Sequence, residues 1–126
     1  MSVVNGVKTP EDKLLSTLGL CARARKLVMG TPMVCEAMRA KKAPVIAVLE
    51  ASDTSANTHK KLSDKCAFYN VPLYRLTADT SALGRAVGKT GVVAAVGVTD
   101  ESLYKALAKY LPAGETLGEA VDTTNE

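Results

Sequence analysis

Six cations flank a short corner of the chain, within the stretch RARKLVMGTPMVCEAMRAKK of residues 23–42. Three of them precede the apolar residues 27–29, and three lie in and after the helical pattern that follows Gly30-Thr31-Pro32. Clustered Lys and Arg side chains neutralise phosphates, and the free N–H groups at the start of a helix favour anions. Glycine lets a backbone come close to a ligand. The pattern therefore predicts that this corner contacts an anionic polymer, and RNA is the partner we expect.

The charge of the chain is unevenly distributed. All 16 Lys and Arg residues lie in residues 1–111 together with nine acids, a formal charge of +7, whereas residues 112–126 hold four acids and no cation. A small domain with this charge predicts an anionic partner such as nucleic acid, although plain solubility also explains it. With one Phe, four Tyr and no Trp, the chain differs from the aromatic-rich proteins that bind single strands.

The residues that catalysis or metal binding would need are scarce. Cys21, Cys35 and Cys66 form no CxxC pair, so we expect reduced thiols that act as small buried residues. The only histidine, His59, lies beside lysines with no obvious acid partner, so it is expected to be exposed and without a role. No phosphate-binding loop of the Walker type occurs. We therefore expect a protein that is not an enzyme and that holds no metal and no cofactor.

One domain is expected, over residues 9–111. Residues 1–8 are predicted to be a flexible lead-in, and the acidic residues 112–126 a disordered tail. No apolar run is long enough for a membrane span, and the first residues lack the apolar core of a signal peptide, which predicts a cytoplasmic protein.

Capping residues and apolar spacing predict the helices. Thr9 as the cap and Pro10 as the first helical residue begin the first helix, and Thr31 and Pro32 repeat this arrangement at the second. Strands are predicted at residues 26–29, 45–49, 71–76 and 92–98, with a helix before the first and after each. This alternation predicts an α/β domain whose central sheet is covered on both faces, and such a sheet needs no partner, so we expect a monomer.

Three stretches together resemble one known family. They are KLLSTLGLCARARKLVMG, VCEAMRAKKAPVIAVLEASDTSANTHKKLSDKCAFYNVPLYRL and ALGRAVGKTGVVAAVGVTD, and the resemblance runs from about Lys13 to Leu111. The chain resembles the YlxQ-type bacterial members of the L7Ae/L30e ribosomal-protein superfamily. The resemblance implies a three-layer α/β/α sandwich around a mixed four-stranded sheet. It also implies binding to kink-turns, which are sharply bent duplex RNA elements with a bulge.

The resemblance further implies RNA contacts from three places that lie close in space. They are the corner and first turn of the second helix (Gly30, Thr31, Pro32, Met33, Glu36), the loop after the second strand (Ser52, Asp53, Thr54) and the loop before the last strand (Gly88, Lys89, Thr90, Gly91, Val92). From their position in the sequence, Arg25, Lys26 and Arg39 are expected to flank the corner and to neutralise phosphates.

The sequence departs from the family pattern at the corner. Kink-turn binders generally carry Asn-Glu where this chain has Pro32 and Met33, and Lys where it has Glu36. Arg25 stands where the bacterial relatives often place Gly. These differences predict weaker or less selective RNA recognition, with charge compensating in part. The alternative is a protein-interaction module with a degenerate RNA site, whose basic surface meets an acidic partner or the ribosome.

Overall fold

The structure is a computed structural model that describes residues 9–40 and 44–111. The predicted lead-in of residues 1–8 and the predicted acidic tail of residues 112–126 lie outside the described residues. Within these described residues, nine elements follow one another: α1 (Pro10–Arg23), β1 (Leu27–Met29), α2 (Thr31–Ala40), β2 (Ala47–Glu50), α3 (Ala56–Tyr69), β3 (Leu73–Arg75), α4 (Thr80–Ala86), β4 (Ala95–Val98) and α5 (Glu101–Ala108).

The four strands form one mixed sheet in the order β1-β4-β2-β3. β2 runs parallel to β3 and antiparallel to β4, and β4 runs antiparallel to β1. All residues of β2 and β4 are buried, as expected for central strands that are covered on both faces. The predicted mixed four-stranded sheet is confirmed.

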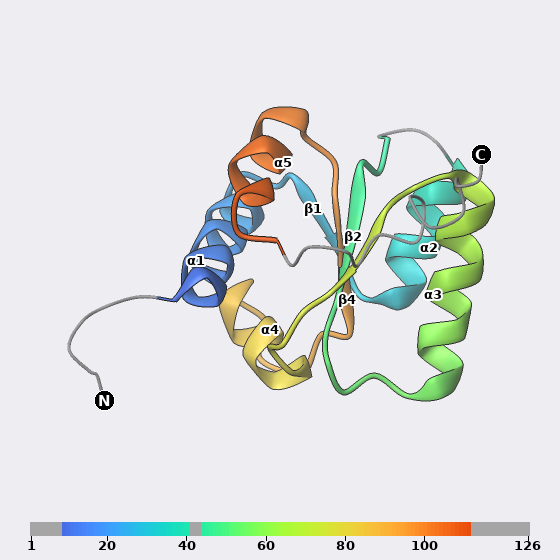
Figure 1. Ribbon diagram of the computed structural model, residues 1–126, viewed down its shortest axis with the longest axis horizontal. Helices are drawn as coiled ribbons and strands as arrows, with labels where there is room; N and C mark the ends of the chain where they lie inside the picture. Colours follow the sequence, from blue (N-terminus) through green and yellow to red (C-terminus); the bar gives the residue numbers. More distant parts are fainter. Residues whose placement is uncertain (1–8, 41–43, 112–126) are drawn as a thin grey trace.

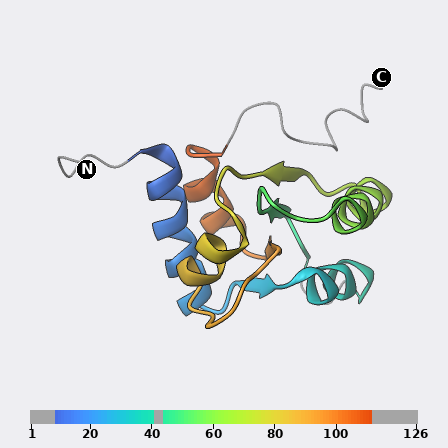
Figure 2. The ribbon, with the colours of Figure 1, turned by 90° about the horizontal axis from the view of Figure 1, so that it is seen from below.

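Helices cover both faces of the sheet, with α1, α4 and α5 on one face and α2 and α3 on the other (Figures 1 and 2). Leu14, Leu18 and Leu107 pack on the first face, and Val34 and Leu62 on the second, and all five are fully buried. Removing these side chains from water is the main force that holds the layers together. The three-layer α/β/α sandwich is therefore confirmed.

Capping explains where most helices begin. Thr9 and Asp12 form a capping box on α1, and Asp100 caps α5 by accepting a hydrogen bond from the N–H of Leu103. The prediction of Thr31 as the cap of the second helix is wrong. Thr31 is the first residue of α2, because the carbonyl of Gly30 already accepts the hydrogen bond from the N–H of Val34. Gly30 can precede the helix in this way because its φ is 93°, a value that L side chains rarely adopt.

All four strands are shorter than predicted, and the difference is largest for β3 and β4. β4 begins at Ala95 rather than near residue 92, because the N–H of Val93 bonds to the carbonyl of Thr80 instead of a neighbouring strand. β3 covers Leu73–Arg75, because the N–H of Val71 bonds back to Cys66 at the end of α3. In the part of the chain that the structure describes, no helix has the length and apolar content needed to cross a bilayer.

Candidate nucleic-acid interface

The start of β4 brings the three predicted contact segments to one end of the sheet. The carbonyl of Ala95 accepts a hydrogen bond of 2.8 Å from the N–H of Gly30, and the carbonyl of Ala94 accepts one of 2.8 Å from the N–H of Ala51. Residues 88–92 lead directly into the same strand. Figure 2 views the molecule from the side on which these segments lie. The three segments are separated by about 20 and 40 residues in the sequence, and they share one surface in the fold.

The corner before α2 presents backbone donors to solvent. By helix geometry, the N–H groups of Thr31 and Met33 have no carbonyl to bind within α2, while Pro32 has no N–H at all. A Cβ atom at Gly30 would meet nothing within 4 Å, so the positive φ alone favours glycine at this position. The hydroxyl of Thr31 is buried and has no hydrogen-bond partner among the described residues. The corner thus offers two N–H donors and an exposed Met33 side chain, which is 56% accessible.

Glu36 is not a free anion at this corner. Its carboxylate pairs with Arg39 one turn along α2, with Oε2 2.6 Å from an NH2 nitrogen and Oε1 3.2 Å from Nε. The hydrogen bond and charge of Arg39 hold the pKa of the Glu36 carboxyl below its ordinary value. Both side chains are exposed. Each charge of this exposed pair is therefore partly neutralised by the other, although both stay accessible to a ligand.

Asp53, in the loop after β2, has a structural partner that the sequence does not reveal. Its carboxylate accepts hydrogen bonds from the backbone N–H of Thr80 at 2.8 Å and from the Thr80 hydroxyl at 3.2 Å. The carbonyl of Thr80 in turn accepts the N–H of Val93. Thr80 therefore joins the loop after β2 to the segment before β4. The side chains of Asp53 and Thr54 are thus both engaged within the protein.

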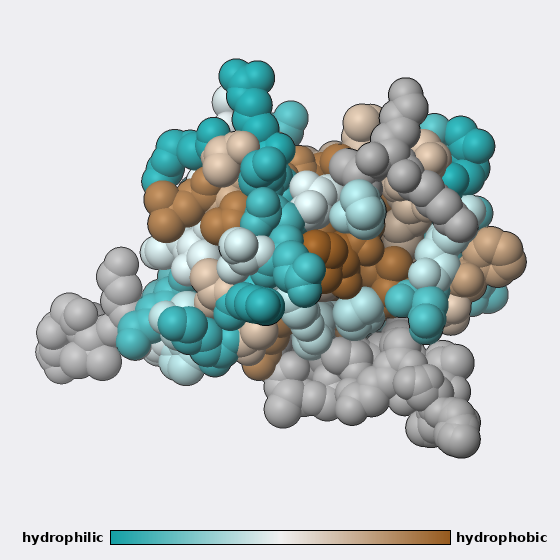
Figure 3. All heavy atoms as spheres, turned by 90° about the horizontal axis from the view of Figure 1, so that it is seen from above, coloured by the Kyte–Doolittle hydropathy of each residue, from teal (hydrophilic) through white to brown (hydrophobic). Residues whose placement is uncertain are grey.

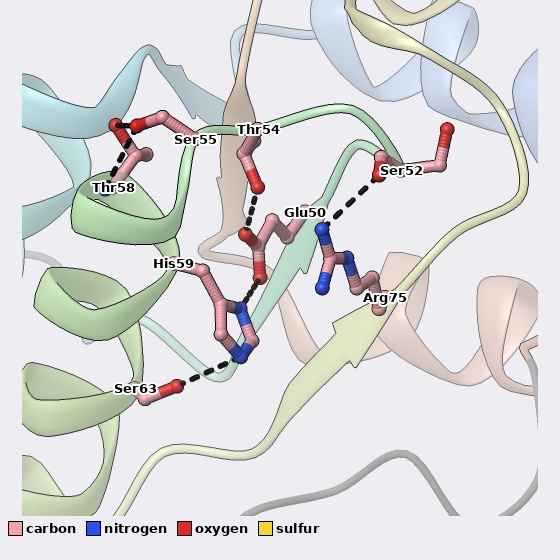
Figure 4. A network of polar contacts seen from close by, with 8 residues as sticks. All are labelled: Glu50, Ser52, Thr54, Ser55, Thr58, His59, Ser63 and Arg75. Carbon is pink, nitrogen blue, oxygen red and sulfur yellow. Dashed lines mark hydrogen bonds and ion pairs between the residues drawn. The ribbon is translucent and has the colours of Figure 1, made fainter.

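The buried carboxylate of Glu50 holds the part of the loop after β2 that leads into α3 (Figure 4). Glu50 is fully buried, accepts a hydrogen bond from the hydroxyl of Thr54, and lies 2.8 Å from Nδ1 of His59. The expectation that His59 is exposed, without an acid partner and without a role is wrong. His59 is half-buried, and it holds α3 against the end of β2. No spacing rule links these two positions, so the pair could be found only in the folded chain.

The loop before β4 is pressed against α4. The carbonyl of Gly84 accepts the N–H of Lys89 at 2.9 Å, and a Cβ atom at Gly84 would overlap the carbonyl oxygen of Gly91. Gly88 has a φ of 81°, which permits the turn out of α4. Lys89 and Thr90 are exposed, and Val92 is 68% accessible. Together with Met33 at the corner, Val92 gives this end of the molecule two exposed apolar side chains.

Arg25, Lys26 and Arg39 do not flank the corner as expected. Lys26 precedes β1, and its backbone carbonyl accepts a hydrogen bond from the N–H of Thr99 at the far end of β4. This position is roughly 13 Å along the strand from Gly30. Arg39 lies about 12 Å along α2 from the corner. Figure 3 views the molecule from the side opposite to Figure 2, where hydrophilic and hydrophobic side chains are intermixed. An RNA contact by these three cations stays a prediction, and it would require a ligand that extends past the end of the sheet.

Arg25 occupies a backbone conformation that favours glycine. Its φ is 62°, in the left-handed region, and its N–H bonds to the carbonyl of Ala22 as the chain leaves α1. A non-glycine residue pays a steric cost in this region.

In the part of the chain that the structure describes, five helices around a mixed four-stranded sheet, with three loops gathered at one end, define a ribosomal-protein-like α/β/α domain. Residues 12–108 match the model of the Ribosomal protein L7Ae/L30e/S12e/Gadd45 family, and the chain belongs to that family.

Three known proteins illustrate the similarity. A protein named "RNA-binding protein YlxQ" from Bacillus subtilis (strain 168) is 40% identical over 94 residues, which is 75% of this chain and 90% of that protein. One of the same name from Enterococcus faecium is 33% identical over 94 residues, covering 75% of this chain and 86% of that protein. The structure of a protein with unknown function from Bacillus halodurans C superposes with a TM-score of 0.70 at 39% identity, over 78% of this chain and 95% of that one.

Proposed function

We propose that this protein is a non-catalytic RNA-binding protein of the cytoplasm that recognises sharply kinked duplex RNA. The contact surface is the end of the sheet formed by residues 30–33, 51–54 and 88–92, which we call the loop end. Two of its relatives are named RNA-binding proteins, and membership of a ribosomal-protein family is consistent with a ribonucleoprotein role.

The observation that carries this proposal is the convergence of the three segments on Ala94 and Ala95. Each segment supplies a different part of a nucleic-acid site. The start of α2 supplies N–H donors for phosphate oxygens or base edges, and the loop after β2 supplies the Ser52 hydroxyl, while the Thr54 hydroxyl is bonded to Glu50. The loop before β4 supplies Lys89 and the exposed Val92. In a kink the bases at the bulge are unpaired, so their faces can lie against apolar side chains such as Val92 and Met33.

In this mode of binding, backbone contacts and charge contribute more than hydrogen bonds from side chains to base edges. Pro32, Met33 and Glu36 cannot make the base-edge hydrogen bonds of Asn, Glu and Lys, and Glu36 is already paired with Arg39. The formal charge of +7 on residues 1–111 favours phosphates regardless of sequence. We therefore expect moderate affinity that falls steeply as salt is raised.

Binding to a generic kink-turn RNA tests the proposal. The purified protein should bind this RNA more tightly than the same RNA with its bulge deleted, as measured by fluorescence anisotropy at a fixed salt concentration. Equal affinity for the two RNAs would contradict kink recognition. It would favour the alternative, in which the basic surface meets an acidic protein partner or the ribosome.

The location of the contact surface has its own test. Lys89→Glu should weaken RNA binding more than Lys105→Glu, because Lys89 lies in the loop end and Lys105 lies on α5, near the opposite end of β4. Both substitutions reverse one exposed charge, so the general electrostatic effect is matched. Similar losses from the two variants would count against this placement.

A further inference from the structure

The outward face of α3 forms a surface that lies outside the loop end. It surrounds an open hollow of about 700 Å³ lined by Asn57, Lys60, Lys61, Asp64, Lys65, Phe68 and Tyr69. These residues recur three or four positions apart, so they share one side of the helix. From Asn57 to Phe68 the face extends about 16 Å along α3. It is therefore a continuous strip that runs along nearly the whole helix.

The strip carries an excess of unpaired positive charge. Lys60 forms an ion pair of 2.9 Å with Asp64, one turn along the helix. Within residues 9–40 and 44–111, neither Lys61 nor Lys65 forms an ion pair or a hydrogen bond through its side chain. Two cations one turn apart on a helix repel each other, so the arrangement does not stabilise α3. An anionic ligand would remove this repulsion.

The one phenylalanine of the chain lies at the end of this strip, where the fold does not need it. Phe68 is 79% accessible, the highest value among the large hydrophobic side chains that are exposed in the described part of the chain. Its ring meets that of Tyr69 edge to face, with centroids 4.8 Å apart and an angle of 87° between the planes. Tyr69 is itself packed against the core. The Phe68 ring is thus held at one edge while it stays open to solvent.

We propose that this strip binds a short unpaired RNA segment that continues from the kinked element held at the loop end. This inference rests on the proposed function and adds a second contact to it. α3 begins one residue after Ser55, directly after the loop of residues 51–54, so the strip starts at the edge of the loop end (Figure 1). Lys61 and Lys65 take phosphates, and Phe68 stacks against one base. A paired base has no free face to stack in this way, which is why the segment must be unpaired.

Three RNAs test this inference by anisotropy against the full chain: a blunt kink-turn RNA, and the same RNA with five unpaired uridines added at either strand end. One of the extended RNAs should bind about tenfold more tightly than the blunt RNA, a typical gain for one stacked base. Phe68→Ala should abolish this gain and leave the affinity for the blunt RNA unchanged. Equal affinity for blunt and extended RNAs would overturn the inference while leaving kink recognition intact.

Further variants separate stacking from general effects. Phe68→Tyr should keep the gain because it keeps an aromatic face, and Phe68→Leu should lose it although the side chain stays apolar. Leu20→Ala removes a comparably exposed apolar side chain from α1 and should keep the gain. The double variant Lys61→Ala, Lys65→Ala should reduce the gain and lower the salt dependence of extended-RNA binding. Persistence of the full gain in Phe68→Ala would overturn the inference, and thermal unfolding of each variant checks that it is folded.

Two other outcomes are decisive. If no kink-turn RNA binds, the proposed function fails. An oligouridine of ten nucleotides then tests the strip alone: binding that Phe68→Ala removes supports the inference, and no binding overturns it.

A synthetic peptide of the acidic residues 112–126 is the competing occupant. If this peptide binds and the double lysine variant releases it, while no extended RNA shows a gain, the strip is a protein-docking surface and the inference is overturned.

Discussion

The carboxylate of Glu50 lies 2.8 Å from Nδ1 of His59, with no solvent access to the acid and 39% of the histidine side chain exposed. Glu50 is the last residue of β2, and His59 lies on the second turn of α3. The contact therefore closes the loop of residues 51–55 at its base, and Thr54 adds a second hydrogen bond to the same carboxylate (Figure 4). A buried acid here stabilises the shape of a loop that we place in the RNA site.

His59→Ala should lower the free energy of unfolding by about 1–3 kcal/mol, because the buried Glu50 carboxylate loses a hydrogen-bond partner. Adding Glu50→Gln should recover part of this loss, since a neutral amide costs less to bury than an unpaired charge. Urea unfolding measures both. Lys60→Ala, an exposed change next to His59 on the helix, serves as the control and should stay within about 0.5 kcal/mol of the parent. A double variant no more stable than His59→Ala would contradict this role for the pair.

Gly84→Ala should destabilise the protein by about 1–3 kcal/mol and weaken RNA binding. The added methyl group would overlap the carbonyl oxygen of Gly91, so either α4 or the loop of residues 88–92 must move. Gly91→Ala is the matched control, because its Cβ atom would meet nothing within 4 Å. Unfolding and anisotropy measurements on the two variants separate a packing effect from a simple change of loop composition. Equal behaviour of the two alanines would contradict the proposed packing of the loop.

Glu36→Lys should raise RNA affinity and make the salt dependence steeper. The substitution removes the anion that pairs with Arg39 and places a cation on the first turns of α2. Each added phosphate contact changes the slope of log K against log salt by about one unit. Glu101→Lys, on α5, makes the same charge change away from the loop end. A larger gain from Glu101→Lys than from Glu36→Lys would place the RNA elsewhere on the molecule.

Stability should fall between pH 9 and pH 12 through the thiol of Cys66. Burial, together with the nearby Cys35 and Glu50, raises the pKa of Cys66 from 9.0 to about 12. In that range the unfolded chain releases the thiol proton and the folded chain retains it. The folded state therefore binds more protons, so its stability decreases as pH rises, by up to about 1.4 kcal/mol per pH unit. Chemical unfolding at several pH values should show a shallower decline in Cys66→Ala than in the parent, and an unchanged slope would contradict the prediction.

Local chemistry in the sequence was enough to predict the elements. Thr9 and Asp100 cap helices because their side-chain oxygens accept hydrogen bonds from N–H groups three residues along the chain. The apolar runs of residues 45–49 and 92–98 predict the buried strands β2 and β4. The two wrong predictions have different causes, which are a hydrogen bond to a residue distant in the sequence and a glycine with positive φ next to the predicted cap. Val93 bonds to Thr80 rather than extending β4, and Gly30 takes the position before α2 that the sequence assigns to Thr31.

The order of the elements, the covered sheet and the excess of positive charge are properties of the sequence itself, because they depend on neighbours within a few residues and on composition. The assembly of the candidate site is a property of the tertiary structure alone. Gly30 and Ala51 reach one end of the sheet because they bond to the adjacent carbonyls of Ala95, the first residue of β4, and Ala94 just before it. The same strand order places Lys26 at the other end. Glu50 meets His59, and Asp53 meets Thr80, only once β2, α3 and α4 have packed.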